Sequence, residues 1–267
     1  MTFSWDPDRY LTYADERGRP FVDLVGRIGD RAPRTVLDLG CGAGNLTALL
    51  AERWPDARVA GLDSSEQMIA RARADHPELG FWVEDLRQFV SSASAPVDVL
   101  VSNATLQWVP GHLDLLPALV ARVAPGGWLA FQVPGNFDEP SHTLRAELAA
   151  EPPYAAHVEG IAEPASHDPE VYLDALLSLG CTVDAWETTY LHVLPGDDPV
   201  FTWVSGTGAR PTLERLATVG LREEFEAEFK RRLAEAYPET GRGVVLPFRR
   251  VFVVAQTPSA DRPSPTG

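Results

Sequence analysis

The stretch Thr35-Val-Leu-Asp-Leu-Gly-Cys-Gly-Ala-Gly-Asn45 decides the fold of this chain. Its apolar start predicts a buried strand, and a helical pattern from Leu46 to Glu52 follows the three glycines at positions 40, 42 and 44. A glycine turn between a strand and the N-terminus of a helix lets a ligand lie against bare backbone, because no Cβ stands in the way. The stretch therefore predicts a nucleotide-type binding corner in an α/β fold.

The spacing of these glycines separates two classes of cofactor. The order is G-x-G-x-G, and Asn45, Leu46 and Thr47 supply no glycine where the dinucleotide fingerprint has its last one. An acid, Asp38, stands two residues before Gly40. This acid-x-G-x-G-x-G order favours S-adenosylmethionine (SAM) over NAD, and an NAD-linked dehydrogenase remains a disfavoured alternative.

Composition excludes several classes of partner. The 267 residues can bury the core of one large α/β domain with an inserted lobe, and the net charge of −15 repels nucleic acid and anionic membranes. The N-terminus does not read as a secretory signal, and no apolar stretch reaches transmembrane length. Cys41 and Cys181 indicate reduced thiols in a cytoplasmic protein, and no zinc spacing predicts a metal site. The oligomeric state stays open.

Alternation of apolar runs with helical patterns predicts βαβ units. Strands are expected at Thr35–Leu39, Arg58–Leu62, Gly80–Val83, Val97–Ser102 and Trp128–Val133, with two late strands at Cys181–Thr189 and Arg250–Ala255. Helices are expected at Pro20–Ile28, Ser65–Arg73 and His112–Ala124, the last one stopped by Pro125-Gly126-Gly127, and at Pro199–Gly206 and Thr212–Ala236. The helices between the late strands predict an insertion that serves as a lid.

Acids at the ends of the second and third strands fit a nucleoside. Asp63 can accept both hydroxyls of a ribose, although it could also cap a helix. Glu84 and Asp85 suit the exocyclic amine of adenine, with the Leu86 amide on a ring nitrogen, although an acidic turn would look the same. Met68 either packs on adenine or belongs to the core.

Polar residues also follow the fourth strand, in Ser102-Asn-Ala-Thr-Leu-Gln-Trp108. Ligands of open α/β sheets bind at the carboxyl ends of the strands. Asn103 can therefore bond the amino-acid part of a cofactor. Trp108 can flank a sulfonium with its ring face, or it can simply cover a surface loop.

Together these residues resemble the class I SAM-dependent methyltransferases over residues 34–134. The resemblance implies a Rossmann-like sheet of seven strands, one of them antiparallel (Arg250–Ala255), with helical lid insertions. It also implies that Asp38 organises the corner that holds the methionine amino group. The cofactor-binding residues expected on these grounds are Asp38, Gly40, Cys41, Gly42, Gly44, Asp63, Ser64, Met68, Asp85, Leu86, Asn103, Ala104 and Trp108.

The outer segments are similar to the bacterial trans-aconitate 2-methyltransferase family. The similar segments are Trp5–Tyr10, Glu16–Pro20, Asp63–Met68, Leu106–Trp108, Glu139–His142, Thr188–Tyr190, Gly208–Pro211 and Pro247–Phe252. This resemblance implies one methyltransferase domain over residues 1–255. Residues 30–135 would bind SAM, and residues 1–30 and 135–245 would form the lid and the acceptor site. Residues 256–267 lie outside the similarity, and their polar, proline-rich composition predicts a disordered tail.

A small tricarboxylate needs local positive charge in so acidic a protein, and guanidinium groups pair with carboxylates in a bidentate way. The expected acceptor-binding residues are Tyr10, Arg17, Arg19, His142, Tyr190, Arg210 and Arg250, with weaker candidates at Arg249 and His192. A carboxylate is already ionised at neutral pH, so we expect no catalytic acid or base. The products would be a monomethyl ester and S-adenosylhomocysteine.

Two further hypotheses stay open at this point. A SAM-dependent O-, N- or C-methyltransferase of a secondary metabolite would usually need a base, and His142 or His192 would then matter. A SAM-binding protein without transferase activity would keep the corner and the acids. Binding of SAM without turnover on a panel of acids would favour this hypothesis of a SAM-binding protein without transferase activity.

Overall fold

The computed structural model describes residues 18–29, 32–161 and 163–259, which divide into two compact units. Among the described residues, the first, the sheet unit, comprises those up to Val133, His167–Glu187 and those from Val251 onward. The second, the helical unit, comprises Pro134–Ser166 and Thr188–Arg250. Within the described residues, none of the helices combines the length and the apolar character needed to cross a bilayer.

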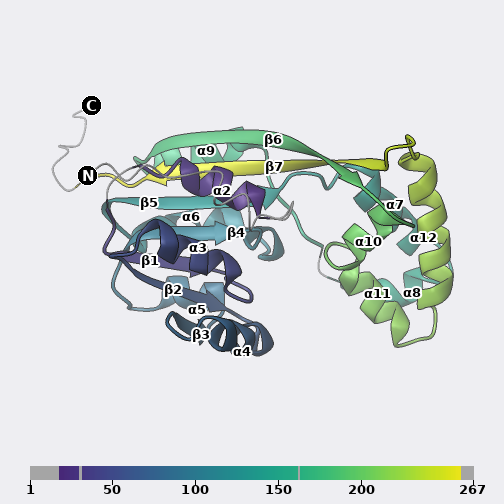
Figure 1. Cartoon of the computed structure of the whole chain (residues 1–267), viewed down its shortest axis with the longest axis horizontal. Coiled ribbons are helices and arrows are strands. Elements are labelled where there is room, and N and C mark those ends of the chain that lie inside the picture. Colours follow the sequence, from purple (N-terminus) through teal and green to yellow (C-terminus); the bar gives the residue numbers. More distant parts are fainter. Residues whose placement is uncertain (1–17, 30–31, 162, 260–267) are drawn as a thin grey trace. The chain divides into compact units, whose positions relative to one another are not determined.

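Seven strands form one sheet in the order β3-β2-β1-β4-β5-β7-β6 (Figure 1). Their bounds are β1 Thr35–Leu39, β2 Arg58–Asp63, β3 Gly80–Val83, β4 Val97–Asn103, β5 Val123–Pro134, β6 Thr182–Leu194 and β7 Val244–Gln256. The four pairs from β3 to β5 are parallel. The sequence correctly predicts all seven strands, and the two late ones are longer than expected.

Strand β7 runs against its neighbour β5. Gly135 donates its N–H to the Arg249 carbonyl at 2.9 Å, and Thr257 donates its N–H to the Gly127 carbonyl at 3.0 Å. Residue numbers therefore increase along one strand as they decrease along the other, which defines an antiparallel pair. The expected mixed sheet with an antiparallel strand around Arg250–Ala255 is confirmed.

Short helices precede or connect the strands of the sheet unit. They are α2 Arg19–Gly26, α3 Asn45–Arg53, α4 Glu66–Asp75, α5 Leu86–Ser91, α6 Leu116–Ala121 and α9 Pro169–Ser178, with 3₁₀ turns η1 Leu106–Trp108 and η2 His112–Leu115. Ser65 caps α4 and Asp85 caps α5, because each side chain accepts a backbone N–H of the first turn.

The helix expected at His112–Ala124 ends early. The α-helical part stops at Ala121, and β5 already begins at Val123, which pairs with Val97. The register then shifts so that Trp128 pairs with Val99. Pro125-Gly126-Gly127 is thus a bulge inside a strand rather than a helix stop. A Cβ on Gly127 would lie 2.6 Å from the Asp98 carbonyl oxygen, so glycine permits this close approach.

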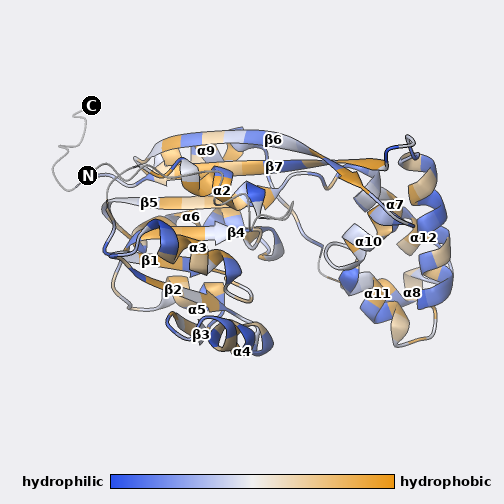
Figure 2. Ribbon diagram, in the orientation of Figure 1, coloured by the Kyte–Doolittle hydropathy of each residue, from blue (hydrophilic) through white to orange (hydrophobic). Residues whose placement is uncertain are grey.

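The core of the sheet unit packs against central strands that are apolar along their length. Leu39, Leu100 and Phe131 are fully buried, one each from β1, β4 and β5. These strands are among the most apolar segments of the chain (Figure 2). Near-continuous apolar runs are typical of parallel strands covered by helices on both faces.

The helical unit has a core of its own. Its helices are α7 Pro140–Ala149, α8 Ala155–Val158, α10 Pro199–Ser205, α11 Arg210–Ala217 and α12 Arg222–Ala236. Phe225 and Phe229 of α12 are fully buried, and the Tyr154 ring meets Phe225 edge-on at 5.0 Å. The single helical pattern expected at Thr212–Ala236 is two helices, because the chain turns at Gly220 with a φ of 73°.

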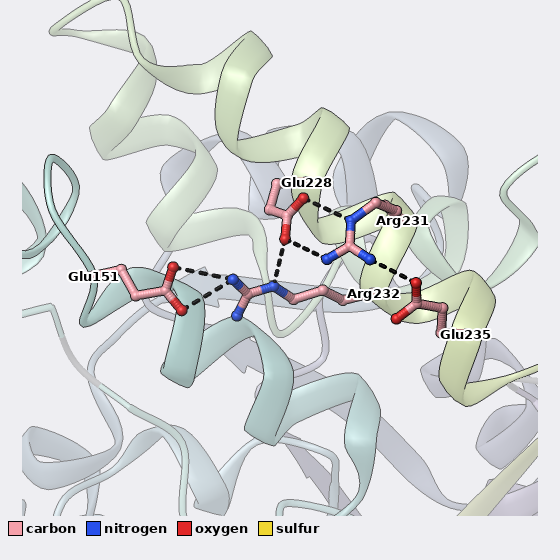
Figure 3. Close-up of polar contacts among 5 residues, drawn as sticks. All are labelled: Glu151, Glu228, Arg231, Arg232 and Glu235. Carbon is pink, nitrogen blue, oxygen red and sulfur yellow. Dashed lines mark hydrogen bonds and ion pairs between the residues drawn. The ribbon is translucent and has the colours of Figure 1, made fainter.

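An ion-pair network ties α12 to the end of α7 (Figure 3). Arg232 Nε donates to Glu228 Oε1 at 2.8 Å, and Arg232 Nη2 donates to Glu151 Oε2 at 3.0 Å. Hydrogen bonds from Arg231 and then Arg232 lower the pKa of the Glu228 carboxyl to about 2. Because these groups face water, the network orders the surface of α12 more than it adds to stability.

The first residues of the expected polar tail are paired with β5. Gln256 still belongs to β7, Thr257 is buried, and Thr257 Oγ1 donates to the Ala124 carbonyl at 2.7 Å. Gly126 donates its N–H to the Pro258 carbonyl at 3.1 Å. Residues 260–267 lie outside the described residues.

Candidate functional site

The glycine corner lies at the carboxyl end of β1, where the strand order reverses. Strand β1 pairs with β2 on one side and with β4 on the other. In open parallel sheets, ligands bind beyond the carboxyl ends of the strands at such a switch point. The expected cofactor residues all stand in or just after β1 to β4 and their following helices.

The three glycines of the corner have different roles, although all have positive φ (73°, 55° and 85° for Gly40, Gly42 and Gly44). A Cβ on Gly40 would lie 2.1 Å from Thr105 Oγ1, and one on Gly44 would lie 2.9 Å from the Phe81 ring. A Cβ on Gly42 would meet nothing within 4 Å. Gly40 and Gly44 therefore allow the corner to pack, whereas Gly42 leaves an open surface for a ligand.

Asp38 is buried beneath this corner, with 1% of its surface exposed. Its Oδ2 accepts the Thr47 hydroxyl at 2.7 Å, while Oδ1 has no partner among the described residues. Burial and, to a lesser extent, the nearby Asp63 charge raise the pKa of this carboxyl to about 7, against the opposing effect of the Thr47 hydrogen bond. A cation placed nearby would favour the charged form. Asp38 is thus suited to stabilise the ammonium end of a ligand.

Asp63 joins the end of β2 to the corner. Its Oδ2 accepts the Gly42 N–H at 3.0 Å and its Oδ1 accepts the Ser65 N–H at 2.8 Å. Each carboxylate oxygen has two lone pairs, so both keep the capacity to accept a hydroxyl. The two backbone bonds fix the plane of the carboxylate, which suits bidentate binding of a ribose.

The acids after β3 have local partners as well. Asp85 Oδ1 accepts the Arg87 N–H at 2.8 Å as the cap of α5, and Glu84 Oε2 accepts the Trp82 indole N–H at 2.7 Å. Leu86 is the first residue of α5, so its N–H has no acceptor within the helix. An adenine edge fits this donor and the second Asp85 oxygen.

The loop after β4 is held in a strained conformation. Ala104 has a φ of 52°, which is unfavourable for a residue with a Cβ. Its N–H donates to the Gln132 carbonyl at 2.9 Å and its carbonyl accepts Gln107 Nε2 at 2.6 Å. Gln132 Nε2 also donates to Asn103 Oδ1 at 2.6 Å. Gln132 was not expected from the sequence, because only the register of β4 on β5 brings it here. Gln107, which was not expected either, lies three residues after Ala104.

Exposure separates the remaining cofactor candidates. Met68 and Trp108 are each 40% exposed, so the expectation that Met68 could be plain core is wrong. Ser64 is exposed as well. Cys41 is buried, and burial raises the pKa of its thiol far above the usual range, so this thiol is not a nucleophile. Only its backbone in the glycine turn can take part in binding.

The described residues expected to bind the acceptor are distributed between the two units. Tyr10 and Arg17 lie outside the described residues, and Arg19 is an exposed residue at the start of α2 in the sheet unit. Arg210 is exposed and pairs with Glu214 at 2.7 Å. His142, Tyr190 and Arg250 belong to the helical unit and are largely buried. Of the expected guanidinium groups that the structure describes, that of Arg250 is therefore best placed to bind a carboxylate inside the protein.

Arg250, His142 and Tyr190 each lie next to an aromatic ring, which for His142 is that of Phe137. The Arg250 guanidinium lies 4.4 Å from the centre of the Phe248 ring, and the Tyr190 ring stacks with that of His192 at 6.3 Å. Burial and, to a lesser extent, the charge of Arg145 lower the pKa of His142 to about 4. His142 is therefore neutral at pH 7 and a weak proton acceptor.

Arg145 is a buried guanidinium that the sequence reasoning missed. It lies on α7 with 4% of its surface exposed and bonds to Glu163 and Thr212. Its helix is not among those expected from the sequence, so no helical pattern set this arginine apart. Only the fold shows that it is turned inward.

Comparison with protein families agrees with this geometry. Residues 11–173, more than half of the chain, match the model of a family described as a methyltransferase domain. Solved structures share the fold at low sequence identity. The YcgJ protein from Bacillus subtilis has a TM-score of 0.59 at 11% identity, with 91% of this chain and 99% of that chain covered. A putative methyltransferase from Bacillus halodurans has a TM-score of 0.56 at 14% identity, with 90% and 100% covered.

Curated relatives are far more similar in sequence. The trans-aconitate 2-methyltransferase of Streptomyces avermitilis is 52% identical, over 94% of this chain and 96% of the relative. The enzymes of the same name from Streptomyces coelicolor and Rhodococcus jostii are 49% and 46% identical, over 96% and 94% of this chain and 87% and 99% of theirs. With this likeness over both units, the chain belongs to the trans-aconitate 2-methyltransferase family of methyltransferase-domain proteins.

Proposed function

We propose that the protein is a SAM-dependent carboxyl O-methyltransferase that forms a monomethyl ester of trans-aconitate or a similar small polycarboxylate. The observation that carries this proposal is the 52% identity to a trans-aconitate 2-methyltransferase over 94% of the chain. That alignment spans the helical unit as well as the glycine corner, so it bears on the acceptor and not only on the cofactor.

The residues of the corner fit SAM. Gly42 offers an open surface, and the buried Asp38 has an oxygen without a partner among the described residues, which would balance the ammonium group. Asp63 would hold the ribose, Asp85 and the Leu86 N–H would bind the adenine edge, and Met68 would cover the ring. The strained loop at Asn103 and Ala104 would contact the methionine part, with Trp108 beside it.

The proposed reaction asks little proton chemistry of the protein. SAM, when bound, supplies a methyl group on a positively charged sulfur. The acceptor carboxylate oxygen bonds to the methyl carbon as the S–CH₃ bond breaks, and the electron pair of that bond returns to sulfur. Ionised carboxylates need no base at neutral pH. His142, with its pKa lowered to about 4, is poorly suited to be one. The protein's part is to orient the two reactants and exclude water.

Arg250 is the residue we assign to the acceptor among those expected from the sequence. Its guanidinium is buried on an aromatic ring, where charge-assisted hydrogen bonds to a carboxylate are strong. Tyr190 would add a hydroxyl. A cytoplasmic location is part of the proposal, supported by two buried cysteines that remain free thiols.

Kinetics of two variants test this assignment. Arg250→Lys keeps the charge but loses the planar fork, so KM for trans-aconitate should rise by about 10- to 100-fold, the effect of one or two lost charged hydrogen bonds. The dissociation constant for SAM should stay the same. His142→Ala should leave kcat within a few-fold of wild type. A collapse of kcat in His142→Ala would instead favour the base-dependent methylation of another acceptor.

A further inference from the structure

Arg145 already holds a carboxylate, that of Glu163. Its Nη1 donates to Glu163 Oε1 at 2.9 Å and its Nη2 to Glu163 Oε2 at 2.5 Å. Nη1 also donates to Thr212 Oγ1 at 3.0 Å, while Nε has no partner among the described residues. This two-pronged arrangement is the geometry with which arginine recognises free carboxylates.

A hollow of about 330 Å³ opens beside this pair, wholly within the helical unit. Most of its wall is small and apolar, formed by Ala146, Ala149, Ala150, Ala155, Val158 and Ile161. Its polar lining consists of Arg145, Glu163, Glu159 and Thr212. Arg145 is the only cation of that lining, so an anionic ligand in the hollow would find one positive partner and one hydroxyl next to it.

The two partners of the ion pair differ sharply in exposure. The side chain of Arg145 is 5% exposed, whereas that of Glu163 is 55% exposed. The carboxylate of Glu163 can rotate into water without losing hydration, because the side chain is already more than half exposed. Arg145 cannot leave, and a buried guanidinium without a partner is strongly unfavourable. Whatever replaces Glu163 must therefore be another carboxylate or a similar anion.

We propose that Arg145 binds a carboxylate of the acceptor. In the free protein the Glu163 carboxylate binds the Arg145 guanidinium, and the acceptor carboxylate displaces it. This inference rests on the proposed function, because it assigns a site for one carboxylate of the same polycarboxylate. Glu163 keeps Arg145 neutralised in the free protein and competes with the acceptor. Apparent affinity is reduced by the fraction of molecules in which the site is free, so Glu163 weakens acceptor binding.

The Glu163→Gln variant gives the inference a distinctive sign. An amide is a poor competitor for the guanidinium, so the dissociation constant of trans-aconitate should fall by about fivefold or more when the self-competition is removed. A purely structural ion pair predicts the reverse, since its loss would only loosen the helical unit. Binding is measured by calorimetry on the enzyme loaded with S-adenosylhomocysteine, with thermal unfolding recorded for each variant.

Two controls isolate the site. Glu147→Gln, on the exposed side of the same helix, removes the same charge and should leave the affinity unchanged. Adding Arg145→Lys to Glu163→Gln should abolish the gain, because the planar fork is lost. Thermal unfolding of the double variant shows whether it is folded.

The binding panel contains succinate, tricarballylate and trans-aconitate, so the outcome does not depend on which acid is methylated. Tighter binding of at least one of them to Glu163→Gln than to wild type supports the inference. If none binds more tightly, the inference is overturned. Failure of the proposed function would show differently, as wild-type enzyme that makes no ester from trans-aconitate.

Discussion

Gly40 and Gly42 share a left-handed backbone but differ in the space around them. Alanine at either position meets a backbone penalty of about 1 kcal/mol. Only at Gly40 would the new methyl also overlap Thr105, at 2.1 Å. Gly40→Ala should therefore lower the melting temperature by clearly more than Gly42→Ala. Gly42→Ala should still weaken SAM binding, because its methyl lies on the open surface of the corner.

Calorimetric unfolding and SAM titration of the two variants, side by side, check this division of roles. Equal loss of stability in both would mean that Thr105 moves away freely. Unchanged SAM affinity in Gly42→Ala would mean that the cofactor does not approach this glycine.

Asp38 links stability, pH and function. Its pKa is raised from 3.8 to about 7, so its contribution to the free energy of unfolding is present below about pH 4 and is lost as the pH rises to 7. Asp38→Asn does not ionise. Between about pH 5 and pH 8, in the absence of ligand, Asp38→Asn should therefore gain roughly 2–3 kcal/mol relative to wild type.

Urea unfolding of both proteins at the two pH values measures this change. The same variant should bind SAM more weakly at pH 8, because the amide carries no charge to balance the ammonium. A stability difference that does not vary with pH would show that Asp38 is ionised at ordinary pH despite its burial.

At the scale of residues, the sequence predicts the positions of functional residues that are close to a recognisable strand in the sequence. Asp38, Asp63 and Asn103 lie at or near the carboxyl ends of strands, so their place at this edge of the sheet could be expected. Gln132 and Arg145 could not be placed in this way. Gln132 depends on the register of β5 against β4, and Arg145 on the inward face of α7 in a separate core. Such positions follow from packing between distant segments, which a single sequence does not specify.

At the scale of elements, strands were easier to anticipate than helix ends. Apolar runs between glycine and polar turns located all seven strands, whereas the proline and glycines at 125–127 suggested a helix stop and form a bulge in β5. The same residues favour both structures. Only the pairing of Val123 with Val97 distinguishes them.

Helix α12 provides a test of the two separate cores. Phe229 is fully buried in the helical unit, so Phe229→Ala should destabilise that unit by about 3–5 kcal/mol. Arg231→Gln, on the exposed ion-pair network (Figure 3), should change stability far less. SAM affinity, measured at low temperature, should stay near wild type in both. Loss of SAM binding in Phe229→Ala would show that the corner depends on the helical unit.

At the scale of the whole molecule, the two units carry different groups of candidate binding residues. The sheet unit carries the corner with Asp38 and Asp63, and the helical unit carries the buried arginines Arg145 and Arg250. The net charge of −15 makes these inward guanidinium groups the natural partners of an anionic acceptor, because the surface as a whole repels it.

The most direct test of the account is the product formed from trans-aconitate and SAM that carries a trideuterated methyl group, identified by mass spectrometry. We predict one trideuteromethyl ester per acid, with S-adenosylhomocysteine released in equal amount. Binding of SAM without any ester from trans-aconitate or related polycarboxylates would contradict the account.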